Sequence, residues 1–286
     1  MRGLRNEAGS ARWRVEAFSF GQASGTTLPS GTRKSLNPQA CDLRILHSTP
    51  SPPGYIPPPA LAPNQVVCGP NYPDGGGSGQ GLSLRTPKGE YDIAQVIARL
   101  PTAQRPDLLV VRVGALGVNF PRNIGSAGCR AVLVIGDTHH FQNPIQTLLS
   151  YALAEPFEAV IFDYTRQHAH FFIEAGLRRV YWLPGFNVRH IELPRDLARD
   201  IPLSFIGQVG RFHPRRAALC KALVAGKMPL SILSGTAEEA RALHARSRVS
   251  LNCSLNADLN LRVFEVPVSN VSITPIASGG CLARCS

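Results

Sequence analysis

Short apolar runs alternate with amphipathic stretches along most of the chain. The runs predict strands at 108–113, 131–136, 159–162 and 180–183, and a helical spacing of apolar residues predicts helices at 93–100, 144–153 and 168–175. The predicted strands are continuously apolar, which is typical of parallel sheets that are covered on both faces. Because strand and helix alternate, the pattern predicts an α/β fold.

A second series of the same kind begins near residue 203. It predicts strands at 203–207, 230–233 and 249–253, and helices at 215–225 and 237–247. The polar segment 192–202 contains proline and is interpreted as a linker between the two series. The sequence therefore predicts two Rossmann-like, doubly wound domains, at 44–191 and 203–286, with a cleft between them where ligands bind.

The N-terminal part of the chain lacks this alternation. Residues 1–43 mix Arg, Ser, Gly and Pro without the apolar core of a secretory signal, so we interpret them as a disordered or spurious extension. The segment 41–90 is rich in Pro and Gly, and its only clear strand candidate is 65–68. No apolar run reaches the roughly 18 residues that span a bilayer. We expect no transmembrane segment, and peripheral membrane association stays open.

The chain is basic, with a formal net charge of +11 from 30 Lys and Arg against 19 Asp and Glu. The basic residues are scattered, apart from short groups such as 211–216, and no long Lys/Arg run carries the interleaved aromatics that track a nucleic-acid backbone. We therefore expect no nucleic-acid partner. An anionic small substrate such as a sugar diphosphate is bound by Arg equally well.

The seven cysteines are odd in number, widely spaced and never arranged as C-x-x-C. This usage indicates a reducing cytoplasm without a disulfide framework. Histidine pairs with H-x-x-x-H spacing are also absent, so we expect no metal site.

Two polar groups follow predicted strands of the first domain. Asp137 and His139 follow the strand 131–136, where either side chain would serve as a general base or hold an acceptor hydroxyl. The alternative is that Asp137 caps the following loop and the histidine is structural. Asp163 follows the strand 159–162 and is expected to cap the next helix, which begins near His168.

Glycine and arginine mark the first strand-to-helix junction of the second domain. Gly207 allows a ligand to approach the backbone closely, and the following helix N-terminus attracts phosphate. Arg211 and Arg215 would then neutralise a diphosphate. The alternative is a tight turn with arginines that face solvent. A dinucleotide-binding fingerprint is excluded, because its third glycine is missing.

The most informative stretch is 260–267, NLRVFEVP, which follows the strand 249–253. Arg262 and Glu265 are three residues apart and so share one helical face. The alternative here is a surface ion pair. Because the stretch lies beyond the carboxyl end of a sheet strand, we favour a site in which the carboxylate binds ribose or sugar hydroxyls.

These segments together resemble a known family. The residues that carry the resemblance are PLSFIG at 202–207, Arg215, VSLN at 249–252 and NLRVFE at 260–265. They look like bacterial glycosyltransferases of the GT-B fold, and resemble most the group 1 enzymes related to the spore maturation protein CgeB. The resemblance covers roughly residues 44 to 282.

The resemblance implies a cytoplasmic, hexosyltransferase-type enzyme that moves a sugar from a nucleotide-sugar donor to an unidentified acceptor. The donor is a substrate, so no cofactor is implied, and cationic side chains and helix dipoles replace a divalent metal. Asp137 and His139 would lie on the acceptor side as catalytic residues. The donor-binding residues implied are Gly207, Arg211, Arg215, Asn260, Arg262, Glu265, Gly279 and Gly280.

The chain departs from the family pattern near its end. The segment 268–276 intervenes between Pro267 and the small-residue run at 277–280, and the sequence ends at Ser286. The resemblance therefore implies that the second domain is truncated and incomplete. An alternative to the enzyme is a degenerate, non-catalytic nucleotide- or sugar-binding module.

Overall fold

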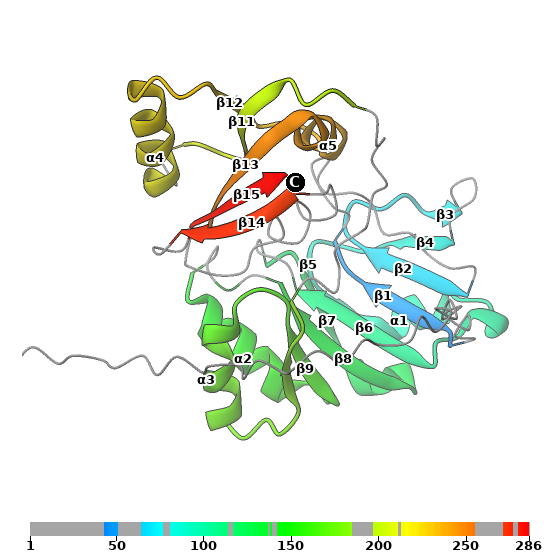
Figure 1. Cartoon of the computed structure of the whole chain (residues 1–286). Helices are drawn as coiled ribbons and strands as arrows, with labels where there is room; N and C mark the ends of the chain where they lie inside the picture. The colour runs from blue at the N-terminus through cyan, green and yellow to red at the C-terminus, as the bar shows by residue number, and fades with distance from the viewer. Residues whose placement is uncertain are drawn as a thin grey trace, which may run out of the picture. The chain divides into compact units, whose positions relative to one another are not determined.

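The computed structural model (Figure 1) describes most of the chain beyond residue 42. The described residues are 43–50, 64–76, 81–113, 117–136, 138, 142–184, 197–210, 213–254, 271–276 and 280–285. They form an α/β structure with a large parallel sheet, as the sequence predicts. The domain boundaries at residues 43, 191 and 202 remain a prediction.

The large sheet has the strand order β10-β9-β8-β6-β1-β2-β4-β3, and every strand is parallel to its neighbours except β3. Its strands are β1 (Ile45–Ser48), β2 (Gln65–Gly69), β3 (Gly75–Gly76), β4 (Leu82–Arg85), β6 (Leu108–Val113), β8 (Arg130–Ile135), β9 (Ala159–Phe162) and β10 (Val180–Trp182). A separate parallel pair is formed by β5 (Gly89–Asp92) and β7 (Asn119–Arg122).

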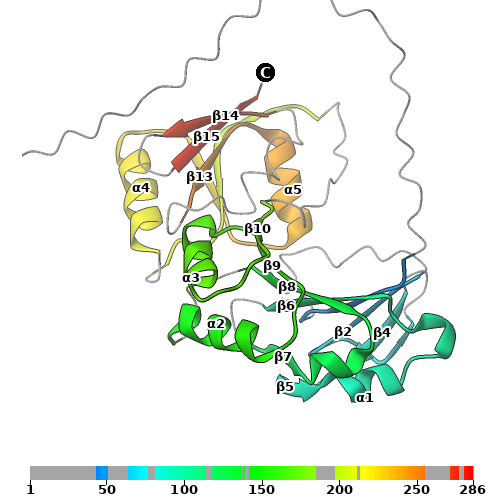
Figure 2. The same cartoon turned by 90° about the horizontal axis from the view of Figure 1, so that it is seen from below.

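Three helices pack against one face of the large sheet (Figure 2) and share a single core with it. They are α1 (Ile93–Ala98), α2 (Pro144–Ala154) and α3 (Ala169–Glu174), with 3₁₀ turns at Thr102–Gln104, Ile124–Ala127 and Arg166–His168. Burial alternates along β1, β6 and β9, so that Leu46 and Leu109 are fully buried while Ile45 and Val110 are half-buried. The face of these strands that meets the three helices is therefore the more deeply buried one.

The Pro- and Gly-rich segment contains more strands than its composition predicts. Besides the predicted strand at 65–68, β1, β4 and β5 form there, although each has only four residues. The reason is tertiary: β1 is a central strand that pairs with both β2 and β6, so its hydrogen bonds come from distant segments. The composition of the segment gives no information about such distant partners.

The smaller sheet has the order β12-β11-β13-β15-β14. Its elements are β11 (Ile201–Ile206), α4 (Pro214–Ala225), β12 (Leu230–Leu233), α5 (Ala237–Arg246), β13 (Ser247–Cys253), β14 (Val271–Ile276) and β15 (Gly280–Cys285). Strand β11 thus begins inside the predicted linker, residues 192–202. The parallel strands β12, β11 and β13 match the predicted pattern.

Helices α4 and α5 cover opposite faces of the smaller sheet, as doubly wound topology requires (Figure 2). Leu203 and Phe205 pack with Cys220 of α4, whereas Ser204 and Ser250 on the other face meet α5. There, Ser250 Oγ lies 2.9 Å from Nδ1 of the buried His244. Both faces of β11 and β13 are therefore covered, one by apolar contacts with α4 and the other by buried hydroxyl and imidazole groups.

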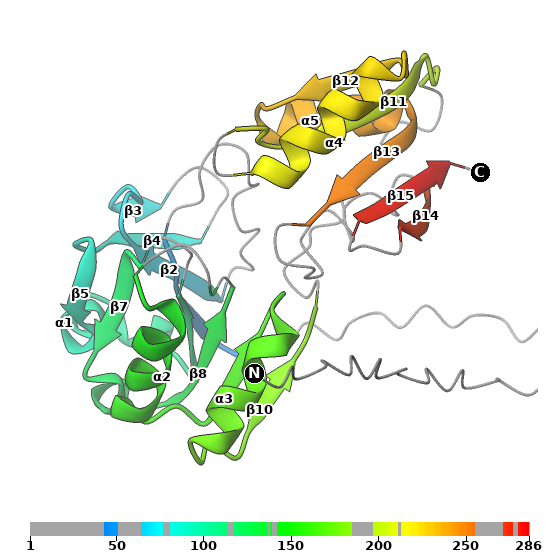
Figure 3. The same cartoon turned by 90° about the vertical axis from the view of Figure 1, so that its left-hand side faces the viewer.

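Two antiparallel strands extend the smaller sheet beyond β13 (Figure 3). Strand β15 pairs with β13, with Gly280 opposite Cys253, and β14 forms the edge. Pro275 is tolerated in β14 because an edge strand does not need every N–H for pairing. Residues 271–276, within the segment that departs from the family pattern, thus form a strand. The smaller sheet therefore contains antiparallel strands, whereas a doubly wound domain predicts a purely parallel sheet.

Candidate functional site

The carboxyl ends of β11 and β13 form a topological switch point in the smaller sheet. From β11 the chain passes through α4 to β12 on one side, and from β12 it returns through α5 to β13 on the other side of β11. Helices on opposite faces leave a crevice outside the strand ends at such a point, which is where open α/β sheets bind ligands. Two predicted segments begin there, the loop after Gly207 and the stretch that leads to Glu265.

Gly207 directly follows β11 and has a backbone conformation that favours glycine. Its φ angle is +141°, a value that side-chain-bearing residues rarely adopt. Its N–H donates to the carbonyl of Leu233 at 2.8 Å, which ties the ends of β11 and β12 together. The predicted role for a glycine at this turn thus has a backbone reason.

Helix α4, which follows β11 in the chain, has an N-terminus without a side-chain cap. Pro214 occupies its first turn, no acidic residue lies there, and His213 at the N-cap position makes no capping bond through its side chain. Uncapped N–H groups and the positive end of the helix dipole favour an anion. Arg215 is exposed on the first turn.

Arg216, the next residue, connects α4 to the end of β13. Its Nε donates to the carbonyl oxygen of Cys253 at 2.8 Å. Arg215, and not Arg216, is the donor-binding residue that the family resemblance implies here. The structure gives Arg216 the contact with β13, so this residue fixes the helix N-terminus beside the strand that leads to the stretch at 260–265.

The N-terminus of α5, which packs on the same sheet, is capped by side chains. Thr236 and Glu239 form a capping box, in which the Thr236 side chain accepts from the Glu239 N–H and the Glu239 carboxylate accepts from the Thr236 N–H. The backbone hydrogen bond from Thr236 lowers the pKa of Glu239. The protein's own carboxylate already fills this N-terminus, so α4 is the better anion site of the two.

A buried ion pair crosses the carboxyl edge of the large sheet. Arg112 on β6 donates from Nη2 to Oδ2 of Asp163 after β9 at 2.6 Å, and the Asp163 side chain is fully buried. The guanidinium passes Gly136 at the end of β8, where the Cβ of any larger residue would lie 3.2 Å from Nη2. The expectation that Asp163 caps the following helix is wrong, because its carboxylate is held by Arg112 and no side chain caps the turn at Arg166–His168 or α3.

The loop after β8 contributes a hydroxyl–imidazole pair. Thr138 is buried, and its Oγ1 lies 2.6 Å from Nδ1 of His168. His170 is exposed, and its Nδ1 lies 2.8 Å from the carbonyl oxygen of Gln167. Of the two histidines, His168 is therefore the one that meets the loop carrying Asp137 and His139.

The switch point of the large sheet, between β1 and β6, is filled by protein side chains. Ser48 Oγ lies 2.7 Å from the Tyr91 hydroxyl, which donates to Oδ1 of Asn119 at 3.1 Å. The Asn119 amide donates in turn to the Ser48 and Arg112 carbonyl oxygens. All three side chains are buried, and burial raises the pKa of Tyr91. This network is structural in character.

Several predicted site residues lie outside the described residues. They are Asp137, His139, Arg211, Asn260, Arg262, Glu265 and Gly279. Within the described ranges, no group of three His, Cys, Asp or Glu side chains is arranged to hold a metal ion. No helix in the described part of the chain is long and apolar enough to cross a membrane.

Comparisons with protein-family models, with curated proteins and with solved structures find no match to this chain.

Proposed function

We propose that the protein is a metal-independent, cytoplasmic glycosyltransferase of the GT-B type, with two Rossmann-like domains. In this proposal a nucleotide-sugar binds at the carboxyl ends of β11 and β13, and its sugar passes to an acceptor held by the first domain. The donor is the substrate, and no further cofactor takes part. The resemblance of 260–265 to the glycosyltransferase motif is the reason for choosing this reaction.

The observation that carries the proposal is the hydrogen bond from Arg216 Nε to the Cys253 carbonyl oxygen, 2.8 Å long. It holds the uncapped N-terminus of α4 beside the strand that leads to Arg262 and Glu265. A diphosphate at this N-terminus would receive backbone N–H groups and arginine charge. The same diphosphate would bring the attached ribose within reach of residues that follow β13.

The chemistry requires stabilisation of a leaving group. When the bond between the sugar and the diphosphate breaks, negative charge develops on the diphosphate oxygens, and Arg215 and the α4 dipole would stabilise it. The acceptor hydroxyl forms the new glycosidic bond and loses its proton to a base. We assign this base to Asp137 or His139, which adjoin Thr138 in the sequence.

Release of nucleoside diphosphate from a panel of nucleotide-sugars tests the reaction. The wild-type protein is expected to release the diphosphate slowly by hydrolysis when no acceptor is present, and Asp137→Asn or His139→Gln is expected to reduce that rate. Binding without release in every case would favour the non-catalytic module instead. If the protein neither binds nor hydrolyses any nucleotide-sugar, the enzyme and the non-catalytic module are both contradicted.

A further inference from the structure

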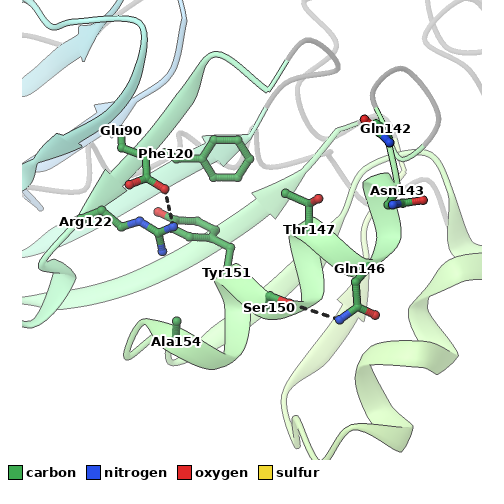
Figure 4. A pocket seen from close by; sticks show the side chains of 10 residues that line it. All are labelled: Glu90, Phe120, Arg122, Gln142, Asn143, Gln146, Thr147, Ser150, Tyr151 and Ala154. Carbon is green, nitrogen blue, oxygen red and sulfur yellow. Dashed lines mark hydrogen bonds and ion pairs between the residues drawn. The ribbon is translucent and has the colours of Figure 1, made fainter.

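A hollow of about 620 Å³, lined by polar side chains together with Phe120, Tyr151 and Ala154, lies between α2 and the two-stranded β5–β7 sheet (Figure 4). Gln146, Thr147 and Ser150 line it from the helix, and Glu90 and Arg122 line it from the strands. Its volume is within the range of small-molecule sites, roughly 300 to 1,000 Å³. None of these residues belongs to the proposed nucleotide-sugar site.

The helix wall of the hollow is unusual because it carries no charge. Helix α2, PIQTLLSYALA, contains no Asp, Glu, Lys or Arg, although Gln146, Thr147 and Ser150 are exposed. Surface helices ordinarily place charged residues on their outer face, as α4 and α5 do here. Gln146 Nε2 donates to Ser150 Oγ at 3.3 Å, and the remaining donors and acceptors of these amide and hydroxyl groups face the hollow, where a ligand can bond them.

The opposite wall is charged but balanced. Arg122 Nη2 donates to Glu90 Oε1 at 2.5 Å, and this hydrogen bond lowers the pKa of Glu90. The guanidinium carbon also lies 5.2 Å from the ring centroid of Tyr151, which fixes its position. Because Arg122 pairs with Glu90 and also lies 3.8 Å from Glu155, this wall has no excess positive charge to attract an anion and offers fixed donors and acceptors instead.

Asn143 adds an amide at the mouth of the hollow. It occupies the N-cap position of α2 with φ of +49°, yet its side chain makes no capping bond. An asparagine at this position ordinarily caps the helix. Here its amide lines the hollow, next to Gln142.

We propose that this hollow binds an uncharged, hydroxyl-rich ligand of the saccharide class. Sugar hydroxyls both donate and accept hydrogen bonds, and so do the Gln146 amide and the Thr147 and Ser150 hydroxyls. The proposal does not rest on glycosyl transfer, because it concerns different residues and predicts binding alone.

Calorimetric titration of the full chain tests the proposal. The probes are three neutral trisaccharides (maltotriose, cellotriose and triacetylchitotriose) and the anionic trigalacturonate. At least one neutral probe is expected to bind saturably. Ser150→Arg places a long cation in the hollow and is expected to weaken that binding about tenfold or more. Gln146→Ala removes one amide and is expected to weaken it about threefold.

Leu153→Arg is the matched control, because Leu153 is 54% exposed on the same helix and does not line the hollow. Its affinity for the probe is expected to equal that of the wild type. Absence of saturable binding to every neutral probe would overturn the proposal. So would tighter binding of trigalacturonate, or equal weakening by Leu153→Arg. Nucleotide affinity should not change in any of these variants, which separates this site from the proposed donor site.

Discussion

The guanidinium of Arg112 spans strand β8 to reach the buried carboxylate of Asp163, with 2.6 Å between Nη2 and Oδ2. The two residues belong to strands that are not neighbours, and the space they need exists because the intervening strand ends in Gly136. The pair therefore joins β6, β8 and β9 at their carboxyl ends.

Arg112→Met is expected to lower the free energy of unfolding by about 3 kcal/mol, because it leaves the Asp163 carboxylate buried without its counter-ion. Urea denaturation followed by circular dichroism measures this change. Adding Asp163→Asn to the same chain should recover part of the loss, since the buried charge is then removed as well.

Arg179→Met provides the comparison, because Arg179 pairs with Glu158 while its own side chain is 58% exposed. Water solvates both partners there, and in the variant Glu158 retains its second ion pair, with Arg130. The free energy of unfolding should stay close to the wild-type value. An equal loss in the two variants would show that burial of the Asp163 charge is not the cause.

The buried network between β1, β5 and β7 gives a second prediction. Tyr91→Phe removes a hydroxyl that bonds Ser48 and Asn119, and leaves their polar groups without that partner. A loss of about 1 to 2 kcal/mol in the free energy of unfolding is expected. The double variant Tyr91→Phe with Ser48→Ala should lose less than the sum of the single variants. Strict additivity would argue against a coupled network.

Acid should weaken the pairing of Arg44 with Asp107. The side-chain hydrogen bond from Arg44 lowers the pKa of Asp107 from its ordinary value of 3.8 to about 2. A carboxylate with a lowered pKa in the folded state contributes stability above its unfolded pKa, and this contribution disappears as the pH falls through the folded value. The stability difference between the wild type and Asp107→Asn should therefore shrink between about pH 4 and about pH 2. A difference that stays constant across this range in urea titrations would contradict the assignment.

Thiol labelling tests the packing of β2. Burial raises the pKa of the Cys68 thiol to about 12 and also raises the pKa of Cys129, but Cys129 is only half-buried and so can be reached by a reagent. Iodoacetamide at mildly alkaline pH should therefore modify Cys129 in the native protein and spare Cys68, because only the thiolate reacts and the reagent must reach it. Peptide mass spectrometry before and after unfolding measures both rates. Rapid native labelling of Cys68 would be inconsistent with a buried β2.

Local patterns were sufficient for the elements with strong periodicity. The strand at 108–113 is β6, and the helix predicted at 144–153 is α2, extended by one residue. In contrast, β5 pairs with β7 across an intervening helix and strand, and the register Tyr91↔Pro121 has no local signal. Such long-range pairs depend on the tertiary arrangement.

The candidate site also combines features that the local sequence predicts with features that depend on tertiary packing. A glycine after β11 and a helix that starts near Pro214 are both readable from sequence, because each follows from backbone geometry. The choice between Arg215 and Arg216 is not, since adjacent helical residues point about 100° apart. Only the packing of α4 beside β13 determines that Arg216 meets Cys253.

Calorimetric titration with nucleoside diphosphates tests the central claim most directly. The wild-type chain is expected to bind at least one of them, and Arg216→Gln and Glu265→Ala are each expected to weaken this binding about tenfold or more. Arg178→Gln, at an exposed arginine of the large-sheet region, is the matched control and should bind as the wild type does. If no diphosphate binds, or if Arg216→Gln and Glu265→Ala leave the affinity unchanged, the switch point between β11 and β13 is not a nucleotide-sugar site.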